Sequence, residues 1–245
     1  MDGCSYLHCD RSDNLMNLDQ YFSSGDIAGI APEIILTLTA LTLLTIEMAR
    51  VSRPGIILLV SALGLLLAGT IVVQGGANDK ILFGGMLHLN KFSMFFDLLY
   101  LFVGLSTLIF SQGYLEKMGG AQRSEFPALI LFGIIGMMLM TRANDLIMVF
   151  LGLELLSLSL YVLVGFLRHD LYSNESGLKY LLLGAFATGF FLFGAALTYG
   201  ATGTTNFSGI ASAISESKIL SDVYLTLGIG LLLIGFAFKL SLIHI

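Results

Sequence analysis

Long apolar stretches recur along this chain and restrict its folding more than any other feature of the sequence. A helix needs about 20 mostly apolar residues to cross the hydrocarbon core of a membrane. Stretches that approach this length occur seven times, at about 27–49, 55–74, 92–112, 126–141, 145–167, 177–200 and 222–240. The sequence therefore predicts a polytopic membrane protein with about seven transmembrane helices.

The spanning segments are expected to be helices, because a backbone inside lipid must satisfy its hydrogen bonds internally. The alternating ten-residue pattern of membrane β-barrel strands does not occur in the sequence. Connections are short, as at 50–54 and 168–170, and the polar break at 142–145 predicts a tight helical hairpin. No soluble domain fits between the spans, so the predicted fold class is all-α, a membrane helix bundle.

The composition is typical of a chain that is solvated mainly by lipid. Of the 245 residues, 56% are hydrophobic and 12% are charged, against about 25% charged residues in soluble domains. The net charge of −5, without a basic block, gives no basis for nucleic-acid binding. Cys4, Cys9 and His8 supply too few ligands for a zinc site. We therefore expect no metal, and we expect the lipid bilayer as a partner.

The chain divides into a polar N-terminal segment, 1–26, and a transmembrane helical domain, 27–245. The polar segment lacks the apolar core of a signal peptide. Met16 begins a short acidic and polar run that leads directly into the first apolar stretch. We expect Met16 to be the true start and residues 1–15 not to be native.

The basic residues that flank the spans do not fix the orientation of the bundle. With Lys179 and Lys239 set aside, five of them lie on each side, so the positive-inside rule does not decide. One group is Arg11, Lys80, Lys91, Arg142 and Lys218, and the other is Arg50, Arg53, Lys117, Arg123 and Arg168. The second group lies in the tighter loops, which favours a cytoplasmic location for those loops and a periplasmic N-terminus.

Glu154 lies within the otherwise apolar run FLGLELLSLSLYVLVGF at 150–166. Its place along the predicted helix is near mid-membrane, where an acidic side chain costs about 2.5–3.5 kcal/mol on insertion scales. Ser157 and Tyr161 follow at i+3 and i+7 and share its face. We interpret Glu154 as an ion or proton site with Ser157 and Tyr161 as its supporting polar face. The alternative is a structural carboxylate that is hydrogen-bonded to its neighbours.

Lys239 is the candidate partner of Glu154. It follows sixteen uncharged residues in the last apolar stretch, and Gly235 lies one turn earlier on the same face. The alternative is a lysine that snorkels from the helix end to the membrane surface. A buried ammonium group can exchange its proton near neutrality, so a pair with Glu154 would form a switchable proton site.

Other ionisable residues in the spans rank lower. Lys179 is a third candidate for the proton pathway, but it lies near a predicted membrane boundary beside Tyr180, where an interfacial anchor is the alternative. Asp97 has no Lys or Arg on its own predicted helix to pair with. Glu33 and Glu47 lie near the two ends of the first span, where we expect water to reach them.

Small residues inside the spans predict close packing of the helices. The chain contains 28 glycines. Gly184 with Thr188, and Ala185 with Gly189, form small-xxx-small pairs of the kind that lets helix backbones approach in a membrane. We therefore expect a tight multi-helix bundle.

Three segments resemble the N subunit of proton-translocating NADH:quinone oxidoreductase, the subunit-2 type of respiratory complex I. They are LGLELLSLSLYVLVGF at 151–166, SGLKYLLLGAFATGFFLFGAALTYGATGTTNF at 176–207 and GFAFKLSL at 235–242. The Glu-centred motif is shared with the wider antiporter-like superfamily. The Gly-Leu-Lys-Tyr start and the Ala-Leu-Thr-Tyr-Gly exit of the sixth span are similar to the N-type subunit specifically.

The resemblance implies a fold and a set of roles. The fold is the N-terminal half of an antiporter-like inverted repeat of fourteen helices. Glu154 matches the mid-membrane carboxylate, Lys239 the lysine that exchanges a proton under its control, and Lys179 an additional lysine of the sixth helix. The chain is then a non-redox, proton-translocating subunit with no catalytic site and no bound cofactor. The complex uses NADH and a quinone such as ubiquinone.

The resemblance also implies surroundings and leaves alternatives. The partners are other membrane-arm subunits of complex I, and the expected location is a bacterial plasma (inner) membrane. One alternative is a subunit of a multi-subunit cation/proton antiporter, whose usual Lys-Ala-Phe and Asn-Arg pattern is missing from the sixth span. Another is a non-pumping structural fragment. The family continues with Pro-Phe-His where this chain ends Leu-Ser-Leu-Ile-His-Ile, so we expect residues 240–245 to be partly or wholly an artefact of a truncated reading frame.

Overall fold

Each of the seven apolar stretches forms a helix in the computed structural model. The helices are α3 (Ala31–Met48), α4 (Pro54–Gly75), α5 (Lys91–Lys117), α6 (Glu125–Arg142), α7 (Leu146–Val164), α8 (Leu171–Thr202) and α10 (Val223–Ser241). Six of the helices are long and apolar enough to cross a membrane, and α10 supplies a shorter apolar segment, Val223–Lys239. The predicted membrane helix bundle is therefore confirmed.

The structure describes residues 24–49, 54–75, 79–117, 124–167, 169–216 and 223–241. The expected start at Met16 lies outside the described residues, as do residues 1–15. Of the expected artefact at 240–245, only the last two residues of α10 are described. The described end of the polar N-terminal segment begins a short helix, α2 (Ser24–Gly29), immediately before α3.

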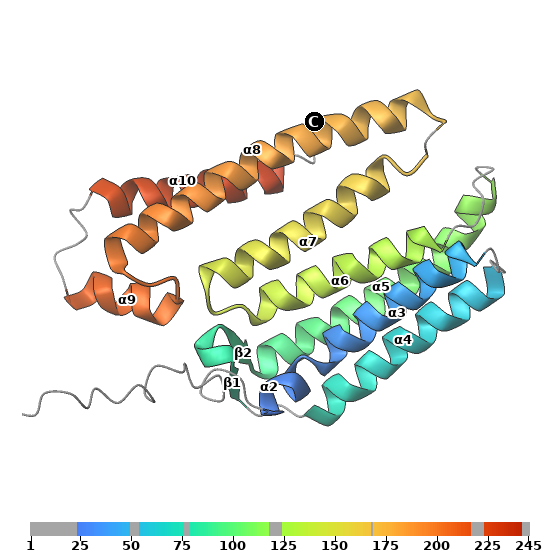
Figure 1. The fold of residues 1–245 in the computed structure, drawn as a ribbon, viewed down its shortest axis with the longest axis horizontal. Coiled ribbons are helices and arrows are strands. Elements are labelled where there is room, and N and C mark those ends of the chain that lie inside the picture. The colour runs from blue at the N-terminus through green and yellow to red at the C-terminus, as the bar shows by residue number, and fades with distance from the viewer. Residues whose placement is uncertain are drawn as a thin grey trace, which may run out of the picture.

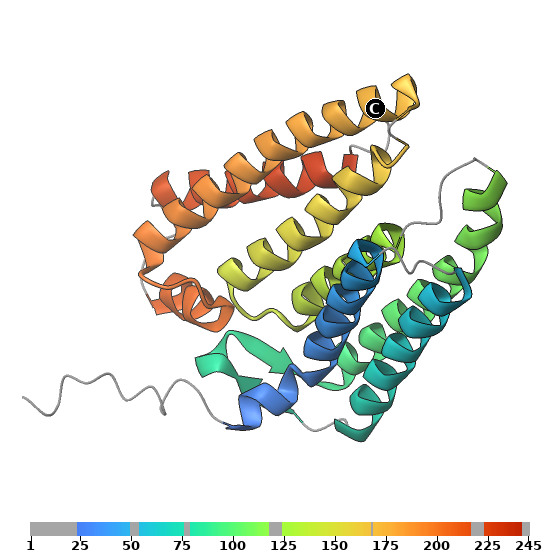
Figure 2. The same cartoon turned by 45° about the vertical axis from the view of Figure 1, so that its right-hand side comes forward.

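The helices pack mainly against their neighbours in the chain, with α6 in a central place. Figure 1 shows α3, α4, α5 and α6 side by side, with α7 beside α6, and α8 and α10 beyond α7. The view in Figure 2 shows the same order. The buried apolar core lies among α3, α4, α5 and α6 and includes Leu43, Leu65, Leu108, Leu131 and Met138. This core holds α3, α4, α5 and α6 together. Helix α7 packs against α6, and α8 packs against α7.

Large apolar side chains cover the outside of the bundle. On α5, Phe95, Phe102 and Phe110 are 62%, 68% and 80% exposed. On α8, Phe186 and Phe193 are exposed in the same way. Contiguous apolar surface of this kind is rare on proteins dissolved in water, so it fits the contact with lipid that the composition predicts.

Glycines bring two pairs of helices into backbone contact. At the α6–α7 hairpin, a Cβ atom on Gly136 would lie 2.7 Å from the carbonyl oxygen of Gly152. Between α8 and α10, a Cβ atom on Gly194 would lie 2.7 Å from the carbonyl oxygen of Gly228. Helices in lipid gain stability from such close van der Waals packing.

The two predicted small-residue pairs of α8 behave differently from each other. Gly184 and Thr188 face α7, where Gly184 lies against the ring of Tyr161. Ala185 and Gly189 are exposed, and no atom lies within 4 Å of a Cβ built on Gly189. Within the part of the chain that the structure describes, no other helix therefore approaches Gly189, and the expected close packing is not found there.

A small β-hairpin and a short helix were not predicted. Strands β1 (Lys80–Leu82) and β2 (Leu87–Leu89) pair antiparallel across η1 (Phe83–Gly85), and α9 (Phe207–Glu216) follows α8. The hairpin, α2 and α9 lie at one end of the bundle in both views (Figures 1 and 2). At the hairpin tip, Asn144 and Asn206 each donate a hydrogen bond to the Gly85 carbonyl oxygen, at 3.0 and 2.9 Å. The hairpin thus joins the α6–α7 and α8–α9 connections.

The Gly136–Gly152 contact gives a first prediction. Gly136→Ala would press a methyl group onto backbone atoms of α7, so we expect the free energy of unfolding to fall by about 1–3 kcal/mol, as for other overpacked sites. Gly189→Ala is the matched control, and helix propensity alone favours it by up to about 1 kcal/mol. Denaturant titration of the detergent-solubilised chain, followed by circular dichroism, measures both. Equal effects of the two substitutions would contradict the packing described.

Candidate functional site

The structure brings Glu154 of α7 into contact with Lys239 of α10. Lys239 Nζ lies 2.7 Å from Glu154 Oε1 and donates a second hydrogen bond to Ser157 Oγ at 3.0 Å. The Lys239 and Glu154 side chains are 13% and 23% exposed. Two residues 85 positions apart in the sequence therefore form a mostly buried ion pair.

Local features of the helices place this pair. The Asp145 side chain caps α7, with Oδ1 accepting from the Ile147 amide at 2.8 Å and Oδ2 accepting from Thr205 Oγ1 at 2.6 Å. The cap fixes where α7 begins and thus the depth of Glu154. On α10, a Cβ atom on Gly235 would lie 3.1 Å from the Ala187 carbonyl oxygen. This close approach to α8 lets Lys239, one turn later, reach α7.

Thr188 is a member of the site that the sequence interpretation took only as a small packing residue. Its Oγ1 lies 2.7 Å from Glu154 Oε1 and 3.0 Å from the Gly184 carbonyl oxygen. A hydroxyl group has one proton to donate, so the two acceptors compete for it. A bond to the charged carboxylate is the stronger one, so Thr188 adds a third side chain to the hydrogen bonds of the Glu154–Lys239 pair. In the sequence, the position of Thr188 one helical turn after Gly184 was the feature that could have indicated this role.

The remaining predicted residues occupy different places. Tyr161 is buried, its hydroxyl lies against Gly184, and its ring meets Tyr180 edge-on with centroids 4.8 Å apart. It therefore extends the face of Glu154 and Ser157 along the α7–α8 contact. Lys179 pairs instead with Glu175 at 2.6 Å, and both side chains are more than 60% exposed. The structure does not bring Lys179 to the Glu154–Lys239 pair.

Sequence comparisons place the pair within a known family. The family described as "NADH:quinone oxidoreductase/Mrp antiporter, TM" matches residues 143–245, which include Glu154 and Lys239. NADH-quinone oxidoreductase subunit N of Trichlorobacter lovleyi is 39% identical over 227 residues, covering 92% of this chain and 46% of the relative. NADH-quinone oxidoreductase subunit N of Rhodospirillum rubrum is 40% identical over 224 residues, covering 90% and 45%.

Residues 143–245 belong to the NADH:quinone oxidoreductase/Mrp antiporter family. The chain spans less than half of the length of the curated relatives it matches.

Solved structures agree with this assignment. Respiratory complex I from Thermus thermophilus with bound aureothin contains a chain that superposes with a TM-score of 0.67 at 31% identity, covering 85% of this chain and 43% of that one. A chain of the membrane-bound sulfane sulfur reductase, an archaeal respiratory membrane complex, superposes with a TM-score of 0.73 at 22% identity, covering 86% and 44%. The second likeness shows a shared fold.

A second buried charge cluster lies outside the residues that match the family, and sequence reasoning missed it. Arg142 at the end of α6 pairs with Asp97 of α5 at 2.7 Å and with Glu33 of α3 at 2.5 Å. Asp97 therefore has a basic partner, but on another helix. Glu33 is 5% exposed, so the expectation that water reaches it was wrong. Glu47 accepts from the Ser124 amide and hydroxyl, each at 3.0 Å, just before α6.

The ion pair between Glu154 and Lys239 gives a prediction for stability. Lys239→Met leaves the Glu154 charge without its cation, so we expect the free energy of unfolding to fall by about 2 kcal/mol. This is less than the roughly 3–5 kcal/mol of a fully buried pair, because both side chains keep some exposure. Adding Glu154→Gln should restore most of the loss. The same denaturant titration, applied as a double-mutant cycle, measures the coupling.

Glu175→Gln and Lys179→Met form the matched control cycle, because this exposed pair lies on the neighbouring helix and should show almost no coupling. Additive effects at Glu154 and Lys239, with no coupling between them, would contradict the ion pair.

Proposed function

We propose that this chain translocates protons as a membrane-arm subunit of an NADH:quinone oxidoreductase, and that Glu154 and Lys239 are the groups that exchange the proton. The observation that carries the proposal is the 2.7 Å contact between these two side chains, made between helices otherwise rich in apolar residues. The subunit N name of the relatives supports the choice of complex.

The charge state of each group in the pair depends on the other. While Glu154 is ionised and in contact, it stabilises the Lys239 ammonium group, which also donates to Ser157. If the contact lengthens, or if a proton reaches Glu154, the ammonium group is left among apolar side chains without a counter-ion. An unpaired buried charge is strongly unfavourable, so Lys239 then gives up its proton. A change in the distance between α7 and α10 is thereby converted into proton uptake or release.

The energy for that change comes from outside this chain in our proposal. We assign the oxidation of NADH and the reduction of the quinone to other subunits, and the bound cofactors with them. This chain is then a non-redox subunit whose partners are the other subunits of the membrane arm. For Lys179 we propose an interfacial anchor, in accord with its exposure and its pairing with Glu175.

We further propose a bacterial plasma membrane, with α2 and the β-hairpin on its periplasmic side. Arg142 was counted among the flanking basic residues, yet it is buried and paired with two carboxylates. Without it, four basic residues flank the side of the N-terminus against five on the other side. The positive-inside rule then favours a cytoplasmic location for the second group.

Proton translocation by cells that assemble this chain into their complex tests the proposal. We expect Glu154→Gln to lower the number of protons moved per NADH oxidised in inverted membrane vesicles several-fold, because an amide cannot alternate between charged and neutral forms. Glu175→Gln is the matched control, since that carboxylate is 61% exposed. NADH oxidation with an artificial electron acceptor reports how much complex has assembled.

An unchanged ratio of protons to NADH in Glu154→Gln vesicles would remove the proton-site assignment and favour a non-pumping structural module. Collapse of a preformed pH gradient on addition of Na⁺, without NADH, would instead favour a cation/proton antiporter.

A further inference from the structure

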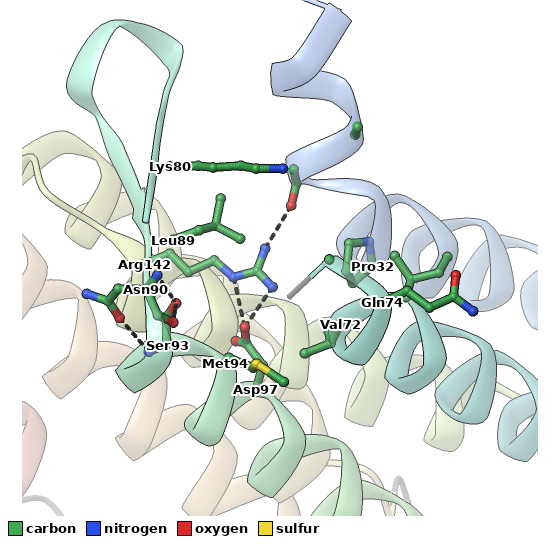
Figure 3. A pocket seen from close by; sticks show the side chains of 14 residues that line it. Pro32, Val72, Gln74, Lys80, Leu89, Asn90, Ser93, Met94, Asp97 and Arg142 are labelled. Atoms are coloured by element: carbon green, nitrogen blue, oxygen red, sulfur yellow. Dashed lines mark hydrogen bonds and ion pairs between the residues drawn. The ribbon is translucent and has the colours of Figure 1, made fainter. Parts of the chain in front are cut away.

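A cavity of about 240 Å³ lies at the hairpin end of the bundle, away from the proposed α7–α10 site. Its wall includes the exposed Lys80 of β1 and Gln74 of α4 and the buried Asp97 and Arg142. Figure 3 shows the Arg142 guanidinium group above Asp97 and below Lys80 in this view. The volume is sufficient for several water molecules, and polar groups line part of the wall.

Three side chains from three helices, which we call the Arg142 cluster, meet beside this cavity: Arg142, Asp97 and Glu33. Arg142 donates to Asp97 Oδ2 from Nε at 3.0 Å and from Nη2 at 2.7 Å. Its Nη1 lies 2.5 Å from Glu33 Oε1 and donates to the Gly29 carbonyl oxygen at 3.1 Å. The side chains of Arg142, Asp97 and Glu33 are 1%, 1% and 7% exposed.

Two carboxylate oxygens of the cluster remain free for a proton. Asp97 Oδ1 and Glu33 Oε2 are buried and accept no hydrogen bond from the described residues. Asn90 and Ser93, which also line the cavity, already bond to each other. They do not compete for Asp97 Oδ1.

The charges of the cluster do not balance. Arginine keeps its proton under all ordinary conditions, so two ionised carboxylates would leave a buried net charge of −1. Like charges at close range and burial both favour the uptake of one proton. Among the described elements around the cavity, α4 contributes only uncharged lining residues, and Lys80 is exposed. Asp26 of α2 accepts a hydrogen bond from the Phe83 amide at 3.4 Å.

We propose that the Arg142 cluster is a second proton-binding site, in which Asp97 and Glu33 share one proton that water in the cavity delivers. Hydronium gives its proton to Asp97 Oδ1, because Asp97 lines the cavity and Glu33 does not. An O–H bond forms, and a neutral water molecule returns to the membrane surface beside Lys80. The bound state is electrically neutral. This site stands apart from the Glu154–Lys239 pair and does not require that pair to pump.

Infrared spectroscopy of the full chain in lipid vesicles tests the proposal. A protonated carboxyl group has a C=O stretch that a carboxylate lacks, and the band shifts when the proton exchanges for deuterium. We expect such a band, sensitive to D₂O, in the wild-type chain. Asp97→Asn and Glu33→Gln should each abolish it, because either substitution leaves one carboxylate and one guanidinium group in balance. Glu154→Gln is the matched control and should retain the band.

Each contrary result would overturn the proposal. No band in the wild-type chain would mean that both carboxylates are ionised and serve only as structural ion-pair partners. A band that survives Asp97→Asn would mean that Glu33 is protonated by itself, and a band unmoved by D₂O would mean that water has no access. An unchanged ratio of protons to NADH in Glu154→Gln vesicles, which would remove the first proposal, would leave the cluster assignment untouched, so the two proposals fail separately.

A second readout needs no variant and therefore does not depend on whether the variants fold. Carbodiimide reagents react with protonated carboxyl groups in apolar surroundings. Mass spectrometry of labelled wild-type chain should find Asp97 or Glu33 modified, with a loss of labelling as the pH is raised. Labelling of neither residue at mildly acidic pH would overturn the shared proton.

Discussion

The ion pair between Glu154 and Lys239 joins α7 to α10, two helices that the whole of α8 separates along the chain. Neither charge is tolerable by itself among apolar helices, because an unpaired ion in such surroundings is strongly unfavourable. The pair therefore determines how α10 must lie, and Gly235 permits that position by letting α10 approach Ala187 of α8. Stability and the proposed proton exchange rest on the same contact. A site that holds two helices together when ionised is also one that responds when those helices move.

Both charged sites hold ionisable groups among apolar helices, but the numbers of acidic and basic groups differ between them. At the pair, one carboxylate faces one ammonium group. Thr188 donates a hydrogen bond to the carboxylate, and Ser157 accepts one from the ammonium group. At the Arg142 cluster, two carboxylates face one guanidinium group that cannot lose its proton. With both groups charged the first site is neutral, so in our proposal it changes protonation when the contact lengthens or when a proton reaches Glu154. The second is neutral only with an added proton, so it binds one without any movement of the helices.

The elements predicted correctly depend on residues that are close together in the sequence. The contacts that were missed join residues that are far apart in the sequence. The length of each apolar stretch was sufficient to predict the seven helices, and the polar stripe on 145–167 was sufficient to single out Glu154. The partners of Asp97 were missed because Arg142 lies on another helix, at an end that was counted as a loop flank. Glu33 is buried where Arg142 and the end of α2 meet the start of α3, and a short helix such as α2, without apolar periodicity, leaves little signal in the sequence. The exposure of Ala185 and Gly189 likewise depends on which face of α8 meets α7.

The end of α2 is hydrogen-bonded both to the Arg142 cluster and to the β-hairpin. Arg142 Nη1 donates to the Gly29 carbonyl oxygen at the end of α2, and Asp26 of α2 accepts from the Phe83 amide of the hairpin turn. The guanidinium group thus divides its donors between two carboxylates and the backbone of the cover. A proton on either carboxylate weakens that carboxylate's hold on Arg142 and leaves the bond to Gly29 with a larger share of its donors. A single side chain, Arg142, therefore links the two carboxylates of the cluster to the backbone at the end of α2.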